Sequence, residues 1–145
     1  MRRLLILPLL LLAGCATIGP QPARIPGQSV VDWIESLPYV PGVLDCSGKA
    51  ALLVDYYRRH RIPALVVIVP APRLVRYAHA LIMPHHAVVA VKVEGRWILV
   101  DPTNRRNVDG LPAPAGLPFL GETALAQELA WAVAYLHSIG LDKPR

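Results

Sequence analysis

Three residues, Cys46, His86 and Asp101, have the types needed for nucleophilic catalysis by a thiol. A cysteine attacks as its thiolate, and a histidine beside it can take the thiol proton or hold the thiolate in an ion pair. A carboxylate then fixes which imidazole nitrogen faces the sulfur and stabilises the charged ring. Attack on a carboxamide would give a thioester, which water resolves in a hydrolase and an amine resolves in a transferase. This chemistry depends on elements that bring the three side chains together.

A helix is predicted from Asp45 onward, with Cys46 in its first turn. Asp45 suits the N-cap, and an inward stripe continues from Cys46 through Ala50, Leu53 and Tyr57 at helical spacing. A helix start offers unpaired N–H groups and a partial positive charge, which stabilise a thiolate and could receive the oxyanion of an attacked carbonyl. A buried structural cysteine at the same place is the alternative interpretation.

The charged residues of this helix lie largely off the inward stripe. They are Lys49, Asp55, Arg58 and Arg59. Asp55 and Arg59 have the i,i+4 spacing of an ion pair along one helix face, which would stabilise the helix slightly.

Two strand-like runs, 86–93 and 96–101, are joined by Glu94-Gly95. An X-Gly pair between β runs signals a two-residue hairpin, since glycine adopts the positive φ that the turn requires. Side chains alternate between the faces of a strand, so in this hairpin His86 and Asp101 share a face as diagonal neighbours. The hairpin thus predicts a histidine–carboxylate pair without assuming any function. The alternatives are a strand-end surface histidine and an aspartate that starts a turn before proline.

The same turn fixes which residues face each other across the predicted hairpin. Val93 must face Arg96, and further from the turn Ala90 must face Leu99. A change of one residue in this register would move one strand's side chains to the other face and separate the histidine from the carboxylate. The register is therefore the critical expectation for the site.

The order and spacing of these segments resemble the transglutaminase-like branch of the papain fold. The resemblance extends over roughly residues 44–104 and includes Arg61-Ile62-Pro63-Ala64 between helix and strand, the His-Ala strand and a Trp-x-x-Val-Asp-Pro-Thr strand. It implies an α+β fold with a papain-like core, in which N-terminal helices, one with the nucleophile at its start, pack on a small antiparallel sheet, and a C-terminal helix follows. It also implies Cys46 as the nucleophile, His86 as the base and Asp101 as the residue that orients the base.

The N-terminal residues have the pattern of a secretory signal peptide. Arg2-Arg3 precedes a short apolar run at 4–12, and small residues follow before Cys15; the apolar run is too short to span a bilayer as a mature helix. The Leu-Ala-Gly-Cys ending resembles the bacterial lipoprotein signal, which implies removal of residues 1–14 and lipidation of Cys15. An uncleaved anchor helix or an ordinary signal peptide is the alternative.

Export follows from either form of this signal. We expect the protein in the bacterial cell envelope, facing the periplasm or the exterior and anchored to a membrane through lipid on Cys15, with acyl chains contributing roughly 0.8 kcal/mol per buried CH₂. Lipidation would leave Cys46 as the free thiol of a chain with two cysteines. A lone thiol in an oxidising compartment is a liability unless it is buried or used.

A single domain is predicted after the lipidation site. Residues 15–28 are rich in proline and glycine without apolar periodicity, which indicates a tether. Residues 29–145 then form one transglutaminase-like domain, long enough to bury a core without disulfides. Its other predicted elements are a helix from Ser29 that Pro38 ends, a buried strand at 65–69, a short helix or loop within 71–84, a loop at 111–118, and a helix at 123–139 with Gly140 as C-cap.

The basic residues do not indicate nucleic-acid binding. Loss of the signal peptide removes Arg2 and Arg3, which lowers the formal charge from +5 to +3. The remaining basic residues are scattered, with short pairs at Arg58-Arg59 and Arg105-Arg106, whereas nucleic-acid binders cluster them along one face or helix. They indicate a solvated surface, with a modest attraction to anionic lipid or cell-wall polymer as the alternative.

No metal or other cofactor is predicted. A metal site built from Cys46, His79, His86 and Asp101 is conceivable, but the chain has no Cys-x-x-Cys or His-x-x-x-His spacing. His85 would lie on the opposite face of its strand from His86 and is the weaker candidate base.

Two functions of different classes remain open. One is an exported, membrane-anchored thiol enzyme that acts through a thioester on peptide or amide bonds of a peptide or protein substrate, as a cysteine peptidase, amidase or transamidase. The other is a non-catalytic lipoprotein that keeps the fold as a binding or assembly module for an envelope protein partner. A free thiol opposite a His–Asp pair favours the enzyme, since a scaffold has no physical need for one.

Overall fold

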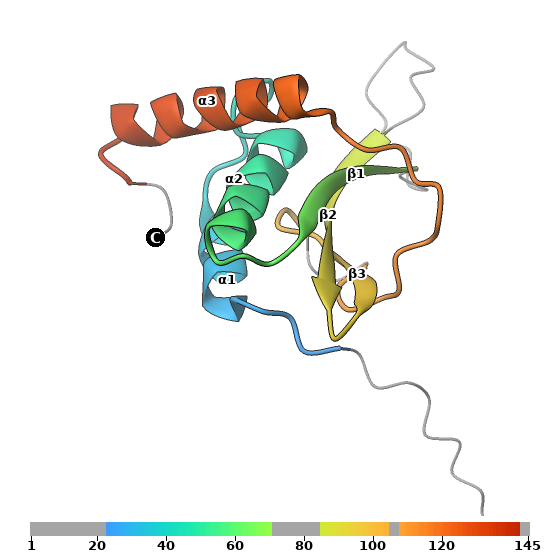
Figure 1. Ribbon diagram of the computed structural model, residues 1–145. Helices are drawn as coiled ribbons and strands as arrows, with labels where there is room; N and C mark the ends of the chain where they lie inside the picture. The colour runs from blue at the N-terminus through green and yellow to red at the C-terminus, as the bar shows by residue number, and fades with distance from the viewer. Residues whose placement is uncertain (1–22, 71–84, 105–107, 143–145) are drawn as a thin grey trace, which may run out of the picture.

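The computed structural model describes residues 23–70, 85–104 and 108–142, which form an α+β arrangement of three helices and a three-stranded antiparallel sheet (Figure 1). The helices are α1 (Gln28–Ser36), α2 (Cys46–Arg59) and α3 (Glu122–Ser138), and the strands are β1 (Ala64–Pro70), β2 (His85–Val93) and β3 (Arg96–Val100). The predicted signal peptide, Cys15, most of the predicted tether, and the undecided segment 71–84 with His79 lie outside the described residues. Within the described ranges, no helix is long and apolar enough to cross a membrane.

Helix α2 lies at the centre of the fold and packs against α1, α3, β1 and β2 (Figure 1). Because it is covered on so many sides, its buried residues extend beyond the predicted stripe to all of 48–54, together with Tyr57. Lys49, which lies off that stripe, is among them and only 2% exposed. The ammonium group reaches backbone carbonyls at the C-terminal end of α1, which solvate it in place of water. The predicted Asp55–Arg59 ion pair is confirmed, at 3.1 Å.

Strands β2 and β3 form the predicted hairpin in the predicted register. Val93 pairs with Arg96, and Ala90 pairs with Leu99. The Glu94-Gly95 turn has φ values of 49° and 80°, the two positive values of a type I′ turn. Strand β1 pairs with the other edge of β2, also antiparallel, which gives the sheet order β1-β2-β3.

Both faces of the sheet are buried. One face, which includes Val89 and Val100, belongs to the main core shared with the helices. The other face, which includes Val88 and Leu99, forms a smaller core with partly buried residues of the segment 108–120. Such burial on both sides explains why the strands are apolar at successive positions rather than alternating.

The segment 108–120, which we call the strap, also pairs with both edges of the sheet. Near its start, the carbonyl of Leu111 accepts the N–H of Leu99 in β3 at 2.8 Å. Near its end, the N–H of Leu120 donates to the carbonyl of Val66 in β1 at 2.9 Å. The loop predicted from its prolines is therefore an irregular chain that crosses the sheet from one edge to the other (Figure 1).

The two outer helices differ slightly from the predicted bounds. Helix α1 begins at Gln28, one residue before the expected Ser29, because Gly27 is its N-cap with φ of 66°. A Cβ at position 27 would lie 2.6 Å from the ring of Tyr56, so glycine is needed there for space as well as for backbone conformation. Helix α3 spans most of the predicted 123–139 and buries three residues of the predicted stripe: Leu125, Ala132 and Leu136.

Candidate active site

His86 and Asp101 meet at the end of the hairpin that lies away from its turn. The Nε2 of His86 is 2.7 Å from Oδ2 of Asp101. Asp101 is 1% exposed, whereas the side chain of His86 is 24% exposed, so the carboxylate is shielded and the ring is partly open. A buried carboxylate at this distance orients the ring and stabilises its charged form. The hairpin register thus brings together the histidine and the carboxylate, as the sequence predicts.

Asp101 is held in place by the turn that follows β3. Its Oδ1 accepts the N–H groups of Thr103 at 2.8 Å and Asn104 at 3.1 Å. Its own N–H donates to Oδ1 of Asp109 at 2.7 Å. The Asp101 carboxylate therefore forms the turn, which was the alternative role predicted from the sequence, and also pairs with His86. Asp109 could not be predicted as a partner of Asp101, because no local pattern in the sequence indicates a contact with a residue eight positions earlier.

The surroundings of His86 favour its protonated form. The hydrogen bond with Asp101 is the main cause, a side-chain hydrogen bond with Cys46 is the second, and partial burial acts in the opposite direction. Together they raise the pKa of His86 from 6.5 to about 10. Since Nε2 is bonded to Asp101, Nδ1 is the ring nitrogen that remains for Cys46. His86 is therefore charged at neutral pH.

Cys46 is the first residue of α2 and a free, half-buried thiol. Asp45 is the N-cap, as predicted, and its Oδ1 accepts the N–H groups of Ser47 at 3.0 Å and Gly48 at 3.4 Å. These two N–H groups, which the sequence suggested for an oxyanion, are therefore already bonded. The backbone N–H of Cys46 is not among the groups that Asp45 binds.

The side chain of Asp45 also ties the start of α2 to its surroundings. Burial alone would raise the pKa of this carboxyl, but hydrogen bonds from Ser47, Gly42 and Gly48 outweigh burial and lower it. The Ser47 hydroxyl lies 2.7 Å from Asp45 Oδ1 and 2.9 Å from Oε2 of Glu128 in α3. The helix start that carries the thiol is thereby fixed against both the preceding turn and α3.

Lys49 fixes the chain between α1 and α2 from the inside. Its ammonium group donates to the carbonyls of Leu37 at 2.7 Å and Glu35 at 3.1 Å. Burial lowers the pKa of Lys49, although the charges of Glu35 and Asp101 act to raise it. The buried Lys49 ammonium, one turn after Cys46, thus anchors the end of α1 and the residues that lead from it to Tyr39.

A tight turn carries Tyr39 back to the nucleophile. Val40 and Leu44 exchange two backbone hydrogen bonds, of 3.1 and 2.8 Å, around a turn that contains Pro41-Gly42. Gly42 has φ of 73°, and proline followed by such a residue is the signature of a type II turn. One residue outward from the Val40–Leu44 pair, Tyr39 lies beside Asp45-Cys46. Tyr39 was not predicted from the sequence, although the Pro-Gly pair between apolar residues is a signal for the turn beside it.

Among the residues that the structure describes, neither another histidine nor a metal site is added to the candidate site. His85 is exposed, and His60 ends α2 with its Nδ1 2.8 Å from the carbonyl oxygen of Tyr56. In the part of the chain that the structure describes, no three His, Cys, Asp or Glu side chains are grouped to hold a metal ion. His79, the fourth member of the metal alternative, lies outside that part.

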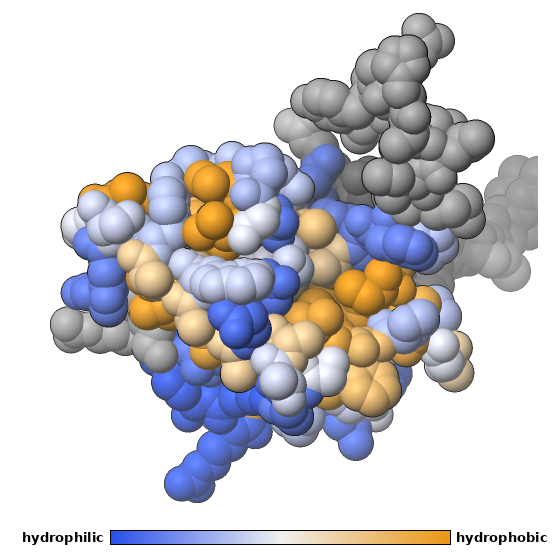
Figure 2. Space-filling view, turned by 90° about the horizontal axis from the view of Figure 1, so that it is seen from above, coloured by the Kyte–Doolittle hydropathy of each residue, from blue (hydrophilic) through white to orange (hydrophobic). Residues whose placement is uncertain are grey.

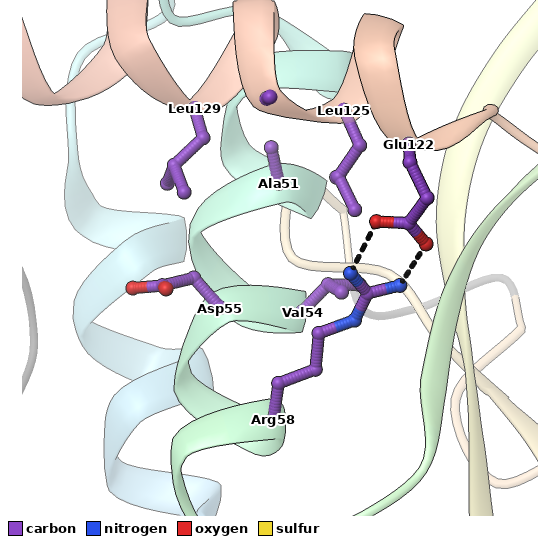
Figure 3. A pocket seen from close by; sticks show the side chains of 8 residues that line it. Ala51, Val54, Asp55, Arg58, Glu122, Leu125 and Leu129 are labelled. Carbon is purple, nitrogen blue, oxygen red and sulfur yellow. Dashed lines mark hydrogen bonds and ion pairs between the residues drawn. The ribbon is translucent and has the colours of Figure 1, made fainter.

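A pocket of about 140 Å³ between α2 and α3 lies away from these residues (Figure 3). It is lined by Ala51, Val54, Asp55, Arg58, Glu122, Leu125, Ala126 and Leu129. At its edge Arg58 and Glu122 form a bidentate ion pair, with both N–O distances 2.8 Å. Seen from above, hydrophilic groups divide the hydrophobic surface on this side into separate patches (Figure 2). The pocket includes neither the thiol nor its proposed partners.

Comparison of the chain with models of protein families, with curated proteins and with solved structures found no match. Function must therefore be inferred from the geometry and chemistry of the site itself.

Proposed function

We propose that the protein is an exported thiol enzyme that acts on peptide or amide bonds, as a cysteine peptidase, amidase or transglutaminase-like acyltransferase. Cys46 is the nucleophile, His86 the base and Asp101 the residue that orients the base. The observation that supports this proposal most strongly is the 2.7 Å bond between His86 Nε2 and the buried carboxylate of Asp101, on a ring that also interacts with Cys46. Packing of the core alone does not require the free Cys46 thiol to lie opposite the His86–Asp101 pair.

The reaction proceeds in two stages. With His86 protonated, the Cys46 thiolate attacks the carbonyl carbon, forms a C–S bond and moves the carbonyl π pair onto oxygen. Collapse of this intermediate re-forms the carbonyl and expels the amine, which takes its proton from His86. The neutral His86 then removes a proton from water or from an acceptor amine, which attacks the thioester and releases Cys46. Asp101 holds one tautomer and orientation of the ring throughout.

The proposal extends to the fold and to the location of the protein. A helix that begins with the nucleophile and packs against an antiparallel sheet that positions the base and its partner supports a papain-like, transglutaminase-like core. Lipidation at Cys15 would hold the domain at a membrane of the bacterial envelope, where its substrate is a peptide or protein. Replacement of Cys15 by Ser should therefore release the full-length protein from the membrane fraction, and retention there would contradict the anchor.

The thiol chemistry is tested by the rate of alkylation with iodoacetamide as a function of pH. At about pH 6 the Cys46 thiol of the full-length protein should react faster than free cysteine, because the imidazolium stabilises its thiolate. His86→Ala should abolish this advantage, whereas His60→Ala, which removes an exposed histidine at the far end of α2, should not. A rate no faster than that of free cysteine and unaffected by His86→Ala would leave the non-catalytic binding or assembly module as the better description.

A further inference from the structure

A turn at the start of the strap, from Val108 to Leu111, is fixed to the edge of β3. The N–H of Leu111 donates to the carbonyl of Val108 at 3.0 Å, and Gly110 has the positive φ, 78°, of the third residue of such a turn. Leu99 of β3 bonds the turn twice: its carbonyl accepts the N–H of Gly110 at 2.9 Å, and its N–H donates to the carbonyl of Leu111 at 2.8 Å. Asp109, the second residue of the turn, therefore has a fixed place beside the end of β3.

The backbone N–H of Asp101 points to the same edge of the sheet as the N–H of Leu99. N–H groups two residues apart on a strand point the same way, and the N–H of Leu99 bonds the strap rather than β2. The pairing of β2 with β3 also ends at Val100, so β2 supplies no acceptor for the Asp101 N–H. The carboxylate of Asp109 supplies one instead, with its Oδ1 2.7 Å from the Asp101 nitrogen.

This bond fixes the backbone from which the Asp101 carboxylate projects. A hydrogen bond from an N–H to an ionised carboxylate is roughly twice as strong as one between neutral groups, and Asp109 is half-buried, which limits competition from water. On the other side of Asp101, its Oδ1 accepts the N–H groups of Thr103 and Asn104. Asp101 is thus held at its backbone by the strap and at its side chain by the turn that follows β3.

The effect of Asp109 on His86 must pass through Asp101. The groups that raise the pKa of His86 are Asp101 and Cys46. The bond from Asp101 to the ring is 2.7 Å long, and a displacement of residue 101 would lengthen it. Loss of the Asp109 acceptor would leave the Asp101 N–H without this partner and allow such a displacement.

We propose that Asp109 is a positioning residue for the thiol chemistry: by binding the N–H of Asp101, it keeps the Asp101 carboxylate where it orients His86. This role rests on the function proposed above, in which His86 transfers the proton and Asp101 holds the ring. Asp109 acts on the backbone and takes no part in the proton transfer. The strap thereby belongs to the site as well as to the sheet.

Two substitutions at position 109 separate the hydrogen bond from the charge. Asp109→Ala removes the acceptor, and the pKa of His86, followed by NMR of the labelled ring in the full-length protein, should fall from about 10 by roughly one unit. The alkylation rate of Cys46 at about pH 6 should fall by up to about tenfold, because the thiolate–imidazolium pair loses the same stabilisation. Asp109→Asn keeps an acceptor oxygen without the charge, so both values should stay near those of the wild type.

Asp55→Ala is the matched control, since it removes an aspartate that pairs with Arg59 on α2. It should leave the titration of His86 unchanged, and a urea midpoint checks that each variant is folded. A lower urea midpoint in Asp109→Ala with the wild-type pKa at His86 would mean that Asp109 only stabilises the fold, and its positioning role would be overturned. If Asp109→Asn titrates like Asp109→Ala, the charge and not the hydrogen bond controls the ring, and the role is likewise overturned.

Two measurements on the wild type complete the test. The backbone N–H of Asp101 should exchange with solvent slowly, and exchange at the rate of an unstructured amide would overturn its bond to Asp109 even if Asp109→Ala does not fold. Alkylation of Cys46 at about pH 6 no faster than that of free cysteine would overturn the proposed function and, with it, a positioning role in that chemistry. A His86 pKa that Asp109→Ala leaves unchanged would overturn the role of Asp109 alone.

Discussion

Asp101 binds His86 with one carboxylate oxygen and the following turn with the other. Oδ2 lies 2.7 Å from the Nε2 of His86, while Oδ1 accepts two backbone N–H groups, from Thr103 and Asn104. Rotation of the carboxylate would disturb both sets of bonds at once. The direction in which the imidazole points is therefore set by the backbone after β3.

Replacement of Asp101 by Asn should preserve this turn and remove the charge. The amide oxygen can still accept from Thr103 and Asn104, but its NH₂ group faces Nε2 and favours a neutral ring. The pKa of His86, followed by NMR of the labelled ring, should fall from about 10 toward 6.5. The alkylation rate of Cys46 at neutral pH should fall with it.

Asp55→Asn is the matched control for this change, because Asp55 pairs with Arg59 on the surface of α2. It should leave both the histidine titration and the alkylation rate unchanged. An Asp101→Asn variant that folds and still titrates at His86 like the wild type would show that the carboxylate does not control the ring.

The same pair should make stability depend on pH in a particular direction. The pKa of His86 is raised on folding, so its contribution to the free energy of unfolding is complete below about pH 6.5 and is lost as the pH rises to about 10. Urea unfolding of the wild type and of His86→Gln should therefore show a difference in stability that shrinks across this interval. A difference that grows with pH would mean that His86 is neutral in the folded protein.

The buried ammonium of Lys49 should matter more for stability than its exposed neighbours on α2. Lys49→Met keeps a chain of similar length but removes the ammonium that donates to the carbonyls of Leu37 and Glu35, which we expect to cost about 1–3 kcal/mol in the free energy of unfolding. Arg59→Met, which removes a partly exposed ion pair, should cost less than about 1 kcal/mol. Equal urea midpoints for the two variants would argue against the anchoring role of Lys49.

Gly48 is needed where the turn before α2 approaches the helix. A Cβ at this position would lie 2.7 Å from the backbone carbonyl oxygen of Val43, which cannot move without shifting the turn that carries Tyr39. Although alanine is the better helix former by about 1 kcal/mol, Gly48→Ala should destabilise the protein by about 1–3 kcal/mol. Gly121→Ser adds a side chain where nothing lies within 4 Å, and its urea midpoint should not fall. A Gly48→Ala variant with a urea midpoint equal to or above that of the wild type would contradict the close approach.

The parts of the site that local sequence determines could be predicted. Glu94-Gly95 sets a turn type, the turn sets the register, and the register sets which residues meet, so the His86–Asp101 pair followed from a few adjacent residues. Asp45 likewise caps the helix that begins with Cys46, from a preference that operates within one turn.

Features that depend on distant backbone could not be predicted in the same way. The partners of Lys49 are carbonyl groups, which every residue has, so nothing in the sequence distinguishes this lysine from those on the surface. Tyr39 lies beside the start of α2 only because the chain reverses between Val40 and Leu44, and Asp109 reaches Asp101 only because the strap returns to β3. Hydrophobic periodicity predicts the secondary structure of one segment, but it does not predict which distant segment that segment contacts.

The strap also affects how the molecule behaves among copies of itself. A sheet edge with free N–H and carbonyl groups recruits strands from other chains and so promotes aggregation. Here backbone groups of β1 and β3 are bonded to the strap at Leu120 and Leu111. Loosening the strap would therefore expose backbone groups on both edges of the sheet to strands of other molecules. At high protein concentration, we expect aggregation to appear alongside any change in the chemistry of the site.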